Sequence, residues 1–303
     1  MGTVVVVGGV NQDLTVHVAT RPRGGETAVG RGPISAWGGK GANQAVAAAY
    51  VGARVRLCAA VGSDQVGLEA VESLRTAGVD VAGVRTVPDV STGMAFIVLT
   101  PDGENSIVVG SGANAELGAS DVESALSHSE GVDVVLVQTE PGPSPVRAAA
   151  AAAARLGLRV VLNAAPVEDA GAEVLAIADP LVLVDHEGVR DLLALRGDEA
   201  GSVPDENLAA HLRAVFGSPS VVVTLGANGA VVAEDGGQQH VPAPKVDPVD
   251  TTGAGDVFVG VVAARVADGW DLVRATHDAC QVAARAVQSQ GARGYLDVDP
   301  RDG

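Results

Sequence analysis

Few of the 303 residues are cysteines, histidines or aromatics, and each shortage excludes a class of protein. Cys58 and Cys280 lie in apolar segments without metal-binding or redox spacing, which excludes a disulfide scaffold and predicts reduced thiols in a cytoplasmic protein. The six histidines show no paired spacing for zinc. Aromatic residues make up only 2% of the chain, so its core has to be built from Ala, Val and Leu.

The sequence also lacks long apolar runs and any excess of positive charge. No stretch approaches the ~18 apolar residues that a membrane helix requires, and the N-terminus has no basic region typical of a signal peptide. The net charge of -17 argues against nucleic-acid and membrane-surface partners, because phosphate backbones and anionic lipids attract basic patches. We therefore expect a soluble acidic protein that binds neither nucleic acid nor membranes.

Hydrophobic patterning predicts the α/β class. The β-branched run over 4–7 ends in two glycines and is typical of a strand buried on both faces of a sheet. No Gly-x-Gly-x-x-Gly follows it, which disfavours a dinucleotide-binding fold of the dehydrogenase type. From about Ser120, helical segments alternate with apolar strands, and this alternation predicts a parallel sheet covered by helices on both faces.

Two segments interrupt this pattern with short alternating strands. The first covers 15–20 and 28–37, and the second is a hairpin of 94–100 and 105–110 whose turn is Pro101-Asp102-Gly103-Glu104. These strands are expected to lie outside the main sheet.

The segment Asp250-Thr251-Thr252-Gly253-Ala254-Gly255-Asp256 leads directly into an apolar helical run. A helix that begins with small residues presents free backbone N–H groups and a partial positive charge, which together form an anion site. Asp256 in the same first turn places a proton acceptor beside a bound anion, as phosphoryl transfer to a hydroxyl requires. The spacing alone equally fits an ordinary glycine-rich turn with an acidic residue in the first turn.

Polar residues near the first strand form a second candidate site. Asn11 and Asp13 follow this strand, where open α/β sheets place their ligands, although a loop Asn or Asp also bonds its own backbone. The segment Gly38-Gly39-Lys40-Gly41-Ala42-Asn43-Gln44 opens a helix and contains one of only two lysines, the other being Lys245. Since Lys40 is followed by glycine and not by Ser or Thr, this segment is not a Walker P-loop.

These two glycine-rich segments resemble the N- and C-terminal signatures of the PfkB family of carbohydrate kinases. The segments around Asn11, Ser91-Thr92-Gly93, Gly112-Ala113-Asn114 and Glu140 are similar to the ribokinase branch, so the resemblance covers nearly the whole chain. It implies a three-layer α/β/α sandwich with a mostly parallel central sheet. The large domain would comprise 1–12, 38–91 and 112–303. A β-sheet lid of 13–37 and 92–111 would close over the sugar and pair with a second copy to give a homodimer.

The resemblance also implies an activity and the residues that perform it. The activity is ATP-dependent phosphorylation of the 5-hydroxyl of D-ribose, with Asp256 as catalytic base and Gly253, Ala254 and Gly255 as the anion hole. The sugar would be held by Asn11, Asp13, Gly39, Lys40, Asn43, Glu140 and Asp256. The ATP contacts would be His186, Thr224, Gly226, Ala227, Asn228, Gly229, Gly255 and Cys280. Mg²⁺ would accompany ATP, and K⁺ would bind at Asp250, Thr252, Ala286, Ser289 and Gly291.

The chain departs from the family pattern in three regions. His186 and Val189 stand where the family has the Asn-x-x-Glu associated with magnesium, and neighbouring Asp185 and Glu187 are candidate replacements. Cys280 replaces a His or Asn near the adenine, and Tyr295 replaces a Ser near the monovalent cation.

These departures and the polar residues leave two alternatives open. One is a deoxyribose or nucleoside kinase of the same family, although a nucleoside would need an apolar wall for its base. The other is a non-catalytic sugar or nucleotide sensor on this scaffold.

Overall fold

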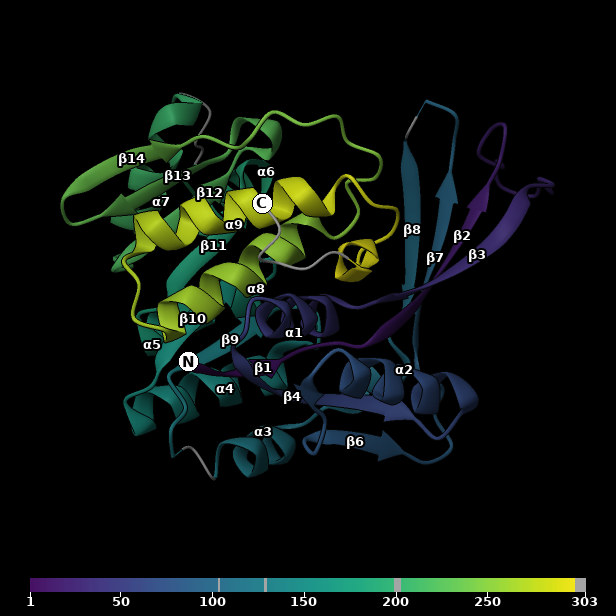
Figure 1. The fold of residues 1–303 in the computed structure, drawn as a ribbon, viewed down its shortest axis with the longest axis horizontal. Helices are drawn as coiled ribbons and strands as arrows, with labels where there is room; N and C mark the ends of the chain where they lie inside the picture. Colours follow the sequence, from purple (N-terminus) through teal and green to yellow (C-terminus); the bar gives the residue numbers. More distant parts are fainter. Residues whose placement is uncertain (103, 128–129, 199–202, 298–303) are drawn as a thin grey trace.

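The computed structural model describes residues 1–102, 104–127, 130–198 and 203–297, which form two sheets and the helices that cover them (Figure 1). The larger sheet contains β1 (Thr3–Val7), β4 (Arg54–Gly62), β5 (Val79–Asp80), β6 (Val84–Val87), β9 (Val134–Gln138), β10 (Arg159–Asn163), β11 (Leu181–Asp185), β12 (Ser220–Thr224), β13 (Ala230–Glu234) and β14 (Gly237–Val241). Its strand order is β14-β13-β12-β11-β10-β9-β1-β4-β5, and β6 also pairs with β4. Only β13 and β14 run antiparallel to their neighbours in this sheet.

Helices cover both faces of the larger sheet. One face packs against α1 (Lys40–Tyr50), α2 (Gln65–Thr76), α8 (Ala254–Ala267) and α9 (Leu272–Ala286). The other packs against α3 (Ala119–Leu126), α4 (Pro143–Leu156), α5 (Asp169–Ala178), α6 (His186–Ala194) and α7 (Leu208–Phe216). In β1, Val4 and Val6 enter the first core while Val5 and Val7 enter the second, because successive side chains of a strand point to opposite faces. The predicted three-layer sandwich is confirmed.

The core is aliphatic, as the shortage of aromatics predicts. The largest fully buried side chains among the described residues are leucines, with one exception, Gln44 in α1. A buried amide has to be hydrogen-bonded, so Gln44 marks a polar network inside an otherwise apolar layer.

The smaller sheet stands apart at one end of the molecule (Figure 1). It comprises β3 (Arg31–Gly38), β2 (Asn11–His17), β7 (Gly93–Leu99) and β8 (Asn105–Gly110), in that order. The antiparallel hairpin of β7 and β8 lies where the sequence predicts it. The pairing of Asn11 with Gly38 extends β2 and β3 slightly beyond the expected segment 13–37, toward the larger sheet.

The sequence did not indicate α5, β13 or β14. Strand β14 consists of Gly-Gln-Gln-His-Val and is exposed except for its last residue, so it carries no alternating hydrophobic signal. Tertiary pairing with β13 makes this polar segment a strand. Within the described ranges, no helix combines the length and the hydropathy needed to span a bilayer.

Candidate active site

The predicted polar residues converge at the point in the larger sheet where the order of the strands reverses. From β1 the sheet extends through β4 on one side and through β9 and β10 on the other, so β1 and β9 form its topological switch point. Asn11 follows β1 and Glu140 follows β9, both beyond the carboxyl ends of the strands. This is the position at which open α/β sheets bind ligands.

Asn11 and Glu140 form a hydrogen-bonded cradle. The Asn11 Nδ2 donates to Glu140 Oε1 at 2.9 Å, and the backbone N–H of Lys40 donates to Glu140 Oε2 at 2.8 Å. Asn114 orients Asn11 from behind, since its Nδ2 donates to Asn11 Oδ1 at 2.7 Å. Burial raises the pKa of Glu140, while the hydrogen bonds and the charge of Lys40 oppose this effect. The cradle is fixed before any ligand binds.

The turn at Gly39 requires glycine. Its φ is +87°, and a Cβ at this position would lie 2.6 Å from the carbonyl oxygen of Gly9 and 2.8 Å from the amide nitrogen of Asn11. The tight approach places the start of α1 against the end of β1, which brings the Lys40 N–H to Glu140.

Asp256 lies in the first turn of α8 and is held by two amides of α1. Asn43 Nδ2 donates to Asp256 Oδ2 at 3.1 Å, and Gln44 Nε2 donates to Asp256 Oδ1 at 2.9 Å. Gln44 is itself fixed by buried partners, because its Nε2 also donates to Asn163 Oδ1 and its Oε1 accepts from Gln138 Nε2. The two signatures, more than 200 residues apart in the sequence, therefore meet at one carboxylate.

The start of α8 has the geometry of an anion site, but one of its backbone N–H groups, that of Ala254, already donates a hydrogen bond within the protein. Gly253 adopts a left-handed conformation with φ +75°, and a Cβ there would lie 2.6 Å from the Cβ of Ala292. The N–H of Ala254 donates to the Thr251 carbonyl at 3.2 Å, so a bound anion would compete with this turn. Gly255 is exposed, and no atom lies within 4 Å of the position that its Cβ would occupy.

Arg293, in the loop after α9, also lies at the site, although nothing in the sequence indicated it. Its Nε donates to Asn43 Oδ1 at 2.9 Å, and its charge acts on both Asp13 and Asp256. Burial raises the pKa of Asp13 to about 6, which Arg293 opposes and Asp256 reinforces. The site therefore combines several carboxylates with one largely enclosed guanidinium.

The expected nucleotide contacts lie farther along the same edge of the sheet. His186 follows β11 and Thr224 ends β12, and Asp185 pairs with Thr224 in the register of these strands. The 3₁₀ helix Gly226–Asn228 is exposed and follows β12. Gly229 requires glycine, because its φ is +90° and a Cβ would lie 2.1 Å from the Val241 carbonyl oxygen. Cys280 is buried in α9, a helix that packs against β13 and β14, and burial raises the pKa of its thiol to about 11.

The two candidate replacements for the missing Asn-x-x-Glu differ in their surroundings. Both are exposed, but the Asp185 side chain caps α6 by accepting from the Gly188 N–H at 2.7 Å. Val189 is a residue of α6, and its side chain is fully buried in the core. His186 lies 3.7 Å from Asp205, measured from Nε2 to Oδ2.

The expected monovalent-cation residues lie together around Asp250. Its two carboxylate oxygens accept from the N–H groups of Thr252 and Gly291, each at 2.9 Å, which ties the loop before α8 to the loop after α9. Partial burial opposes ionisation, but these hydrogen bonds prevail and lower the pKa of Asp250. Ala286 and Gly291 carbonyls each accept one N–H, from Ser289 and Gly294, and retain a second lone pair for a cation.

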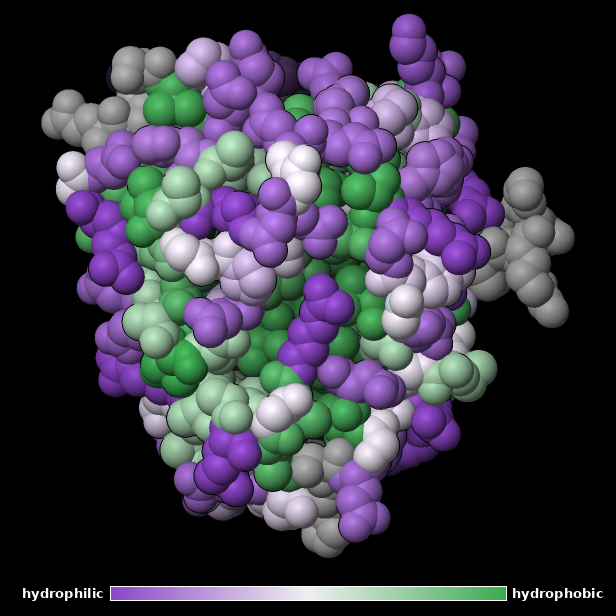
Figure 2. Space-filling model, turned by 90° about the vertical axis from the view of Figure 1, so that its left-hand side faces the viewer, coloured by the Kyte–Doolittle hydropathy of each residue, from purple (hydrophilic) through white to green (hydrophobic). Residues whose placement is uncertain are grey.

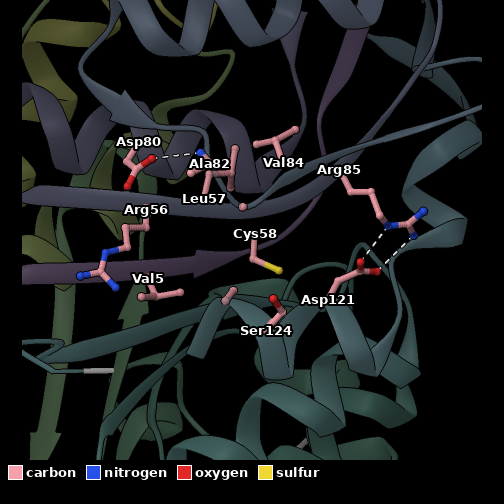
Figure 3. Close-up of a pocket in the computed structure, with 12 residues that line it drawn as sticks. Val5, Arg56, Leu57, Cys58, Asp80, Ala82, Val84, Arg85, Asp121 and Ser124 are labelled. Atoms are coloured by element: carbon pink, nitrogen blue, oxygen red, sulfur yellow. Dashed lines mark hydrogen bonds and ion pairs between the residues drawn. The ribbon is translucent and has the colours of Figure 1, made fainter. Parts of the chain in front are cut away.

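A separate cavity of about 710 Å³ lies between β4 and α3, and no predicted site residue lines it (Figure 3). Its charged side chains include Arg85 and Asp121, which pair with each other at 2.7 Å. The Cys58 thiol is part of the lining, but it is buried and its pKa is raised to about 12, chiefly by burial. The cavity is therefore separate from the site at which the two glycine-rich segments meet.

The raised pKa of Asp13 predicts that the carboxylate lowers stability at neutral pH. Because the folded state holds this proton up to about pH 6 and the unfolded chain only to about 3.8, stability falls as pH rises between these values. We expect Asp13→Asn to increase the free energy of unfolding by about 1–3 kcal/mol at pH 8 and by much less at pH 4.5. Urea unfolding at both pH values measures this, with exposed Asp169→Asn as control. A pH-independent difference would contradict the assignment.

Comparison with known proteins gives the same family over the whole chain. The model of the pfkB family carbohydrate kinases matches residues 1–298. The ribokinase of Haemophilus influenzae is 35% identical over 297 residues, which cover 97% of this chain and 95% of that protein. A deoxyribokinase of Salmonella typhi is 30% identical over 291 residues, covering 96% and 94% of the two chains.

Solved structures of similar fold include ligand complexes. Ribokinase from Cryptococcus neoformans in complex with ADP has a TM-score of 0.81 at 31% identity, and the match covers 98% of each chain. Ribokinase from Arabidopsis thaliana, complexed with ribose and ATP, has a TM-score of 0.83 at 26% identity. The match covers 100% of this chain and 99% of that chain. Both match this chain across its two sheets.

Proposed function

Because the chain belongs to the pfkB family of carbohydrate kinases and is an ATP-dependent sugar kinase, we propose that it transfers the γ-phosphoryl group of ATP to the 5-hydroxyl of D-ribose. The observation that carries this proposal is the position of Asp256. Two amides of α1 hold its carboxylate beside the Asn11–Glu140 cradle, at the start of a helix whose first turn can bind an anion.

Asp256 acts as the base that receives the proton of the attacking hydroxyl. Once deprotonated, that oxygen attacks the terminal phosphorus of ATP and displaces ADP in line. The N–H of Gly255, together with that of Ala254 after it leaves Thr251, stabilises negative charge on the transferring group. Mg²⁺, bound with ATP, would neutralise part of the charge of the phosphates.

The cradle suits a polyol. Asn11 and Asn43 retain amide N–H groups for sugar hydroxyls, and the carboxylates of Asp13 and Glu140 accept from others. A site built from such groups rejects analogues that lack one hydroxyl by up to ~10⁴-fold, because its buried polar atoms are left unpaired. Gly39 supports the cradle through its backbone, and the charge of Lys40 acts on Glu140.

The loops around Asp250 supply a site for a monovalent cation. The Asp250 carboxylate and the carbonyls of Thr252, Ala286, Ser289 and Gly291 are hard oxygen donors, which suit K⁺ better than a soft metal. K⁺ there would stiffen the loop that leads into α8 and thus the amides of the anion hole. Among the described residues, no three His, Cys, Asp or Glu side chains cluster as metal ligands. Mg²⁺ typically uses one or two carboxylates together with substrate phosphates, so here it would bind with ATP.

ATP would lie along the edge beyond β11 and β12. Its phosphates would approach Gly255, and its adenosine would lie between the Gly226–Gly229 turn and the buried Cys280. His186 and Thr224 follow adjacent strands between these two regions. We place the reaction in the cytoplasm, where ATP is abundant and thiols such as Cys58 and Cys280 stay reduced.

A coupled ATP-turnover assay tests the proposal. Purified protein is given D-ribose, 2-deoxy-D-ribose, a hexose or a nucleoside, each with Mg²⁺ and with or without K⁺. We expect kcat/KM to be highest for D-ribose and to increase with K⁺. No ATP consumption with any acceptor would favour a non-catalytic sugar or nucleotide sensor, and ATP consumption that does not depend on an acceptor would contradict the proposed transfer.

One alternative acceptor has a specific observation behind it. The 30% identity to a deoxyribokinase over nearly the full length makes 2-deoxy-D-ribose the second candidate. A higher kcat/KM for 2-deoxy-D-ribose than for D-ribose would support it and would imply that no cradle residue depends on the 2-hydroxyl.

We also propose that the smaller sheet is a lid through which two copies associate. Its exposed apolar side chains include Ile34, Phe96, Ile107, Val108 and Val109, and Val108 is 68% exposed. The side of the molecule away from this sheet intersperses hydrophilic and apolar side chains (Figure 2). Contiguous exposed apolar strands mark association surfaces, and dimerisation would also cover the edge strands β3 and β8.

Replacing Ile107 and Val108 together by Asp is expected to convert a dimer into a monomer. These neighbours in β8 point to opposite faces, so the double variant places a charge on each face of the lid. Sedimentation equilibrium measures the mass of both proteins, and Leu195→Asp, at an exposed position after α6, is the control. A wild-type monomer, or a double variant that remains dimeric, would contradict the proposal.

A further inference from the structure

Arg293 carries a positive charge into the acceptor pocket from the loop after α9. Its Nε donates to Asn43 Oδ1 at 2.9 Å, and its Nη2 lies 3.5 Å from the Gly38 carbonyl oxygen. Burial lowers the pKa of Arg293 to about 10, although Tyr295, Asp13 and Asp256 act in the opposite direction. The guanidinium is therefore charged at neutral pH.

The hydrogen bond from Arg293 decides which way the Asn43 amide points. A guanidinium has donors only, so it requires the oxygen of the amide and not its nitrogen. With Oδ1 facing Arg293, Nδ2 has to face Asp256, where it donates to Oδ2 at 3.1 Å. A flipped amide would instead direct its oxygen at the carboxylate and would repel it.

The charges around the pocket give the guanidinium a second effect. Asp13 comes from β2, Glu140 from the loop after β9 and Asp256 from α8. Within the part of the chain that the structure describes, the charge of Arg293 acts on Asp13 and Asp256, and the charge of Lys40 acts on Glu140. Tyr50 and Tyr295 pack edge to face beside Arg293, with ring centroids 5.0 Å apart. Arg293 is thus the cation that faces Asp13 and Asp256.

We propose that Arg293 is a positioning residue for the phosphoryl acceptor: it fixes the Asn43 amide, which holds Asp256, and it offsets the negative charge of Asp13 and Asp256. This inference rests on the proposed sugar-kinase function. It assigns Asn43 one role toward the sugar. With its oxygen accepting from Arg293 and one N–H donated to Asp256, Asn43 presents its remaining N–H to an acceptor hydroxyl.

The kinetic test compares Arg293→Met, which removes charge and donors, with Arg293→Lys, which keeps the charge. We expect Arg293→Met to lower kcat/KM for D-ribose by about 10²-fold, since misplacing a catalytic group by ~1 Å has an effect of this size. KM for ATP should stay within about twofold, and Arg293→Lys should recover part of the loss. Arg155→Met, at an exposed arginine in the last turn of α4, is the control.

A double-mutant cycle separates positioning from general damage to the fold. In an Asn43→Ala background the amide is absent. The fold-decrease in kcat/KM caused by adding Arg293→Met should therefore be at least about tenfold smaller than the fold-decrease that it causes in the wild type. Equal losses in the two backgrounds would overturn the positioning role.

A measurement without substrate distinguishes failure of this inference from failure of the proposed function. Carboxyl ¹³C NMR of the free protein follows the titration of Asp13, whose pKa is raised to about 6 chiefly by burial. Arg293→Met should raise it further, and Arg155→Met should leave it unchanged. An unmoved Asp13 titration overturns the charge role even if D-ribose is not the acceptor. If the wild type phosphorylates D-ribose and Arg293→Met does so equally well, the inference fails while the function stands.

Discussion

Replacing Asp256 by Asn is expected to lower kcat for D-ribose phosphorylation by about 10² to 10⁴-fold, the range that a positioned general base contributes. The amide cannot receive the proton of the attacking hydroxyl. It also fits its surroundings less well than the carboxylate, because Asn43 and Gln44 each donate to one oxygen of Asp256 and an amide has only one oxygen. The mismatch should cost about 1–3 kcal/mol of stability, which leaves the protein folded.

Steady-state kinetics and chemical unfolding together test this expectation. KM for ATP should change little, since the lost function concerns the acceptor. Asp169→Asn is the matched control, because Asp169 is an exposed carboxylate in the first turn of α5. Turnover of Asp256→Asn within about threefold of the wild type would reject Asp256 as the base.

The second large effect is expected from Gly253→Ala at the start of α8. The φ of +75° costs an L-residue about 1–2 kcal/mol, and the new Cβ would lie 2.6 Å from the Cβ of Ala292. Relief of this contact has to move the backbone of α8 or the loop that carries Arg293. Either movement displaces the anion hole or the acceptor pocket, so kcat/KM should fall by about 10²-fold or more.

A glycine at the other end of the same helix separates backbone strain from geometry at the site. Gly269 follows α8, has φ +80°, and has no atom within 4 Å of the position of a Cβ. Gly269→Ala should lose a similar 1–2 kcal/mol, roughly the cost of a left-handed alanine, yet keep its turnover. Calorimetry and kinetics on both variants give the comparison. Equal activity of the two variants would show that the start of α8 tolerates displacement.

Local sequence patterns predicted the fold class and indicated the two glycine-rich segments, whereas Glu140 and the expected ATP contacts came from the family resemblance. The run over 4–7 and the later alternation of helices and strands indicated a parallel sheet, because periodicity is a local property of the chain. The glycine-rich segments were recognisable since each needs special backbone geometry within a few residues, as at Gly39 and Gly253. Strand β14 had no such signal, because its partner across the sheet and not its own sequence makes it a strand.

The sequence by itself determined the kinds of residue that meet at the site: a carboxylate at a helix start, and polar side chains after the first strand. Only the tertiary structure decided how those residues are oriented. Arg293 holds Asn43, Gln44 holds Asp256 and Asn163 holds Gln44, each through a contact that spans more than 100 residues of the chain, and no local pattern encodes contacts of that range. Hydrogen-bond direction is set by which donor lies opposite which acceptor, and that is fixed only when the helices pack on the sheet.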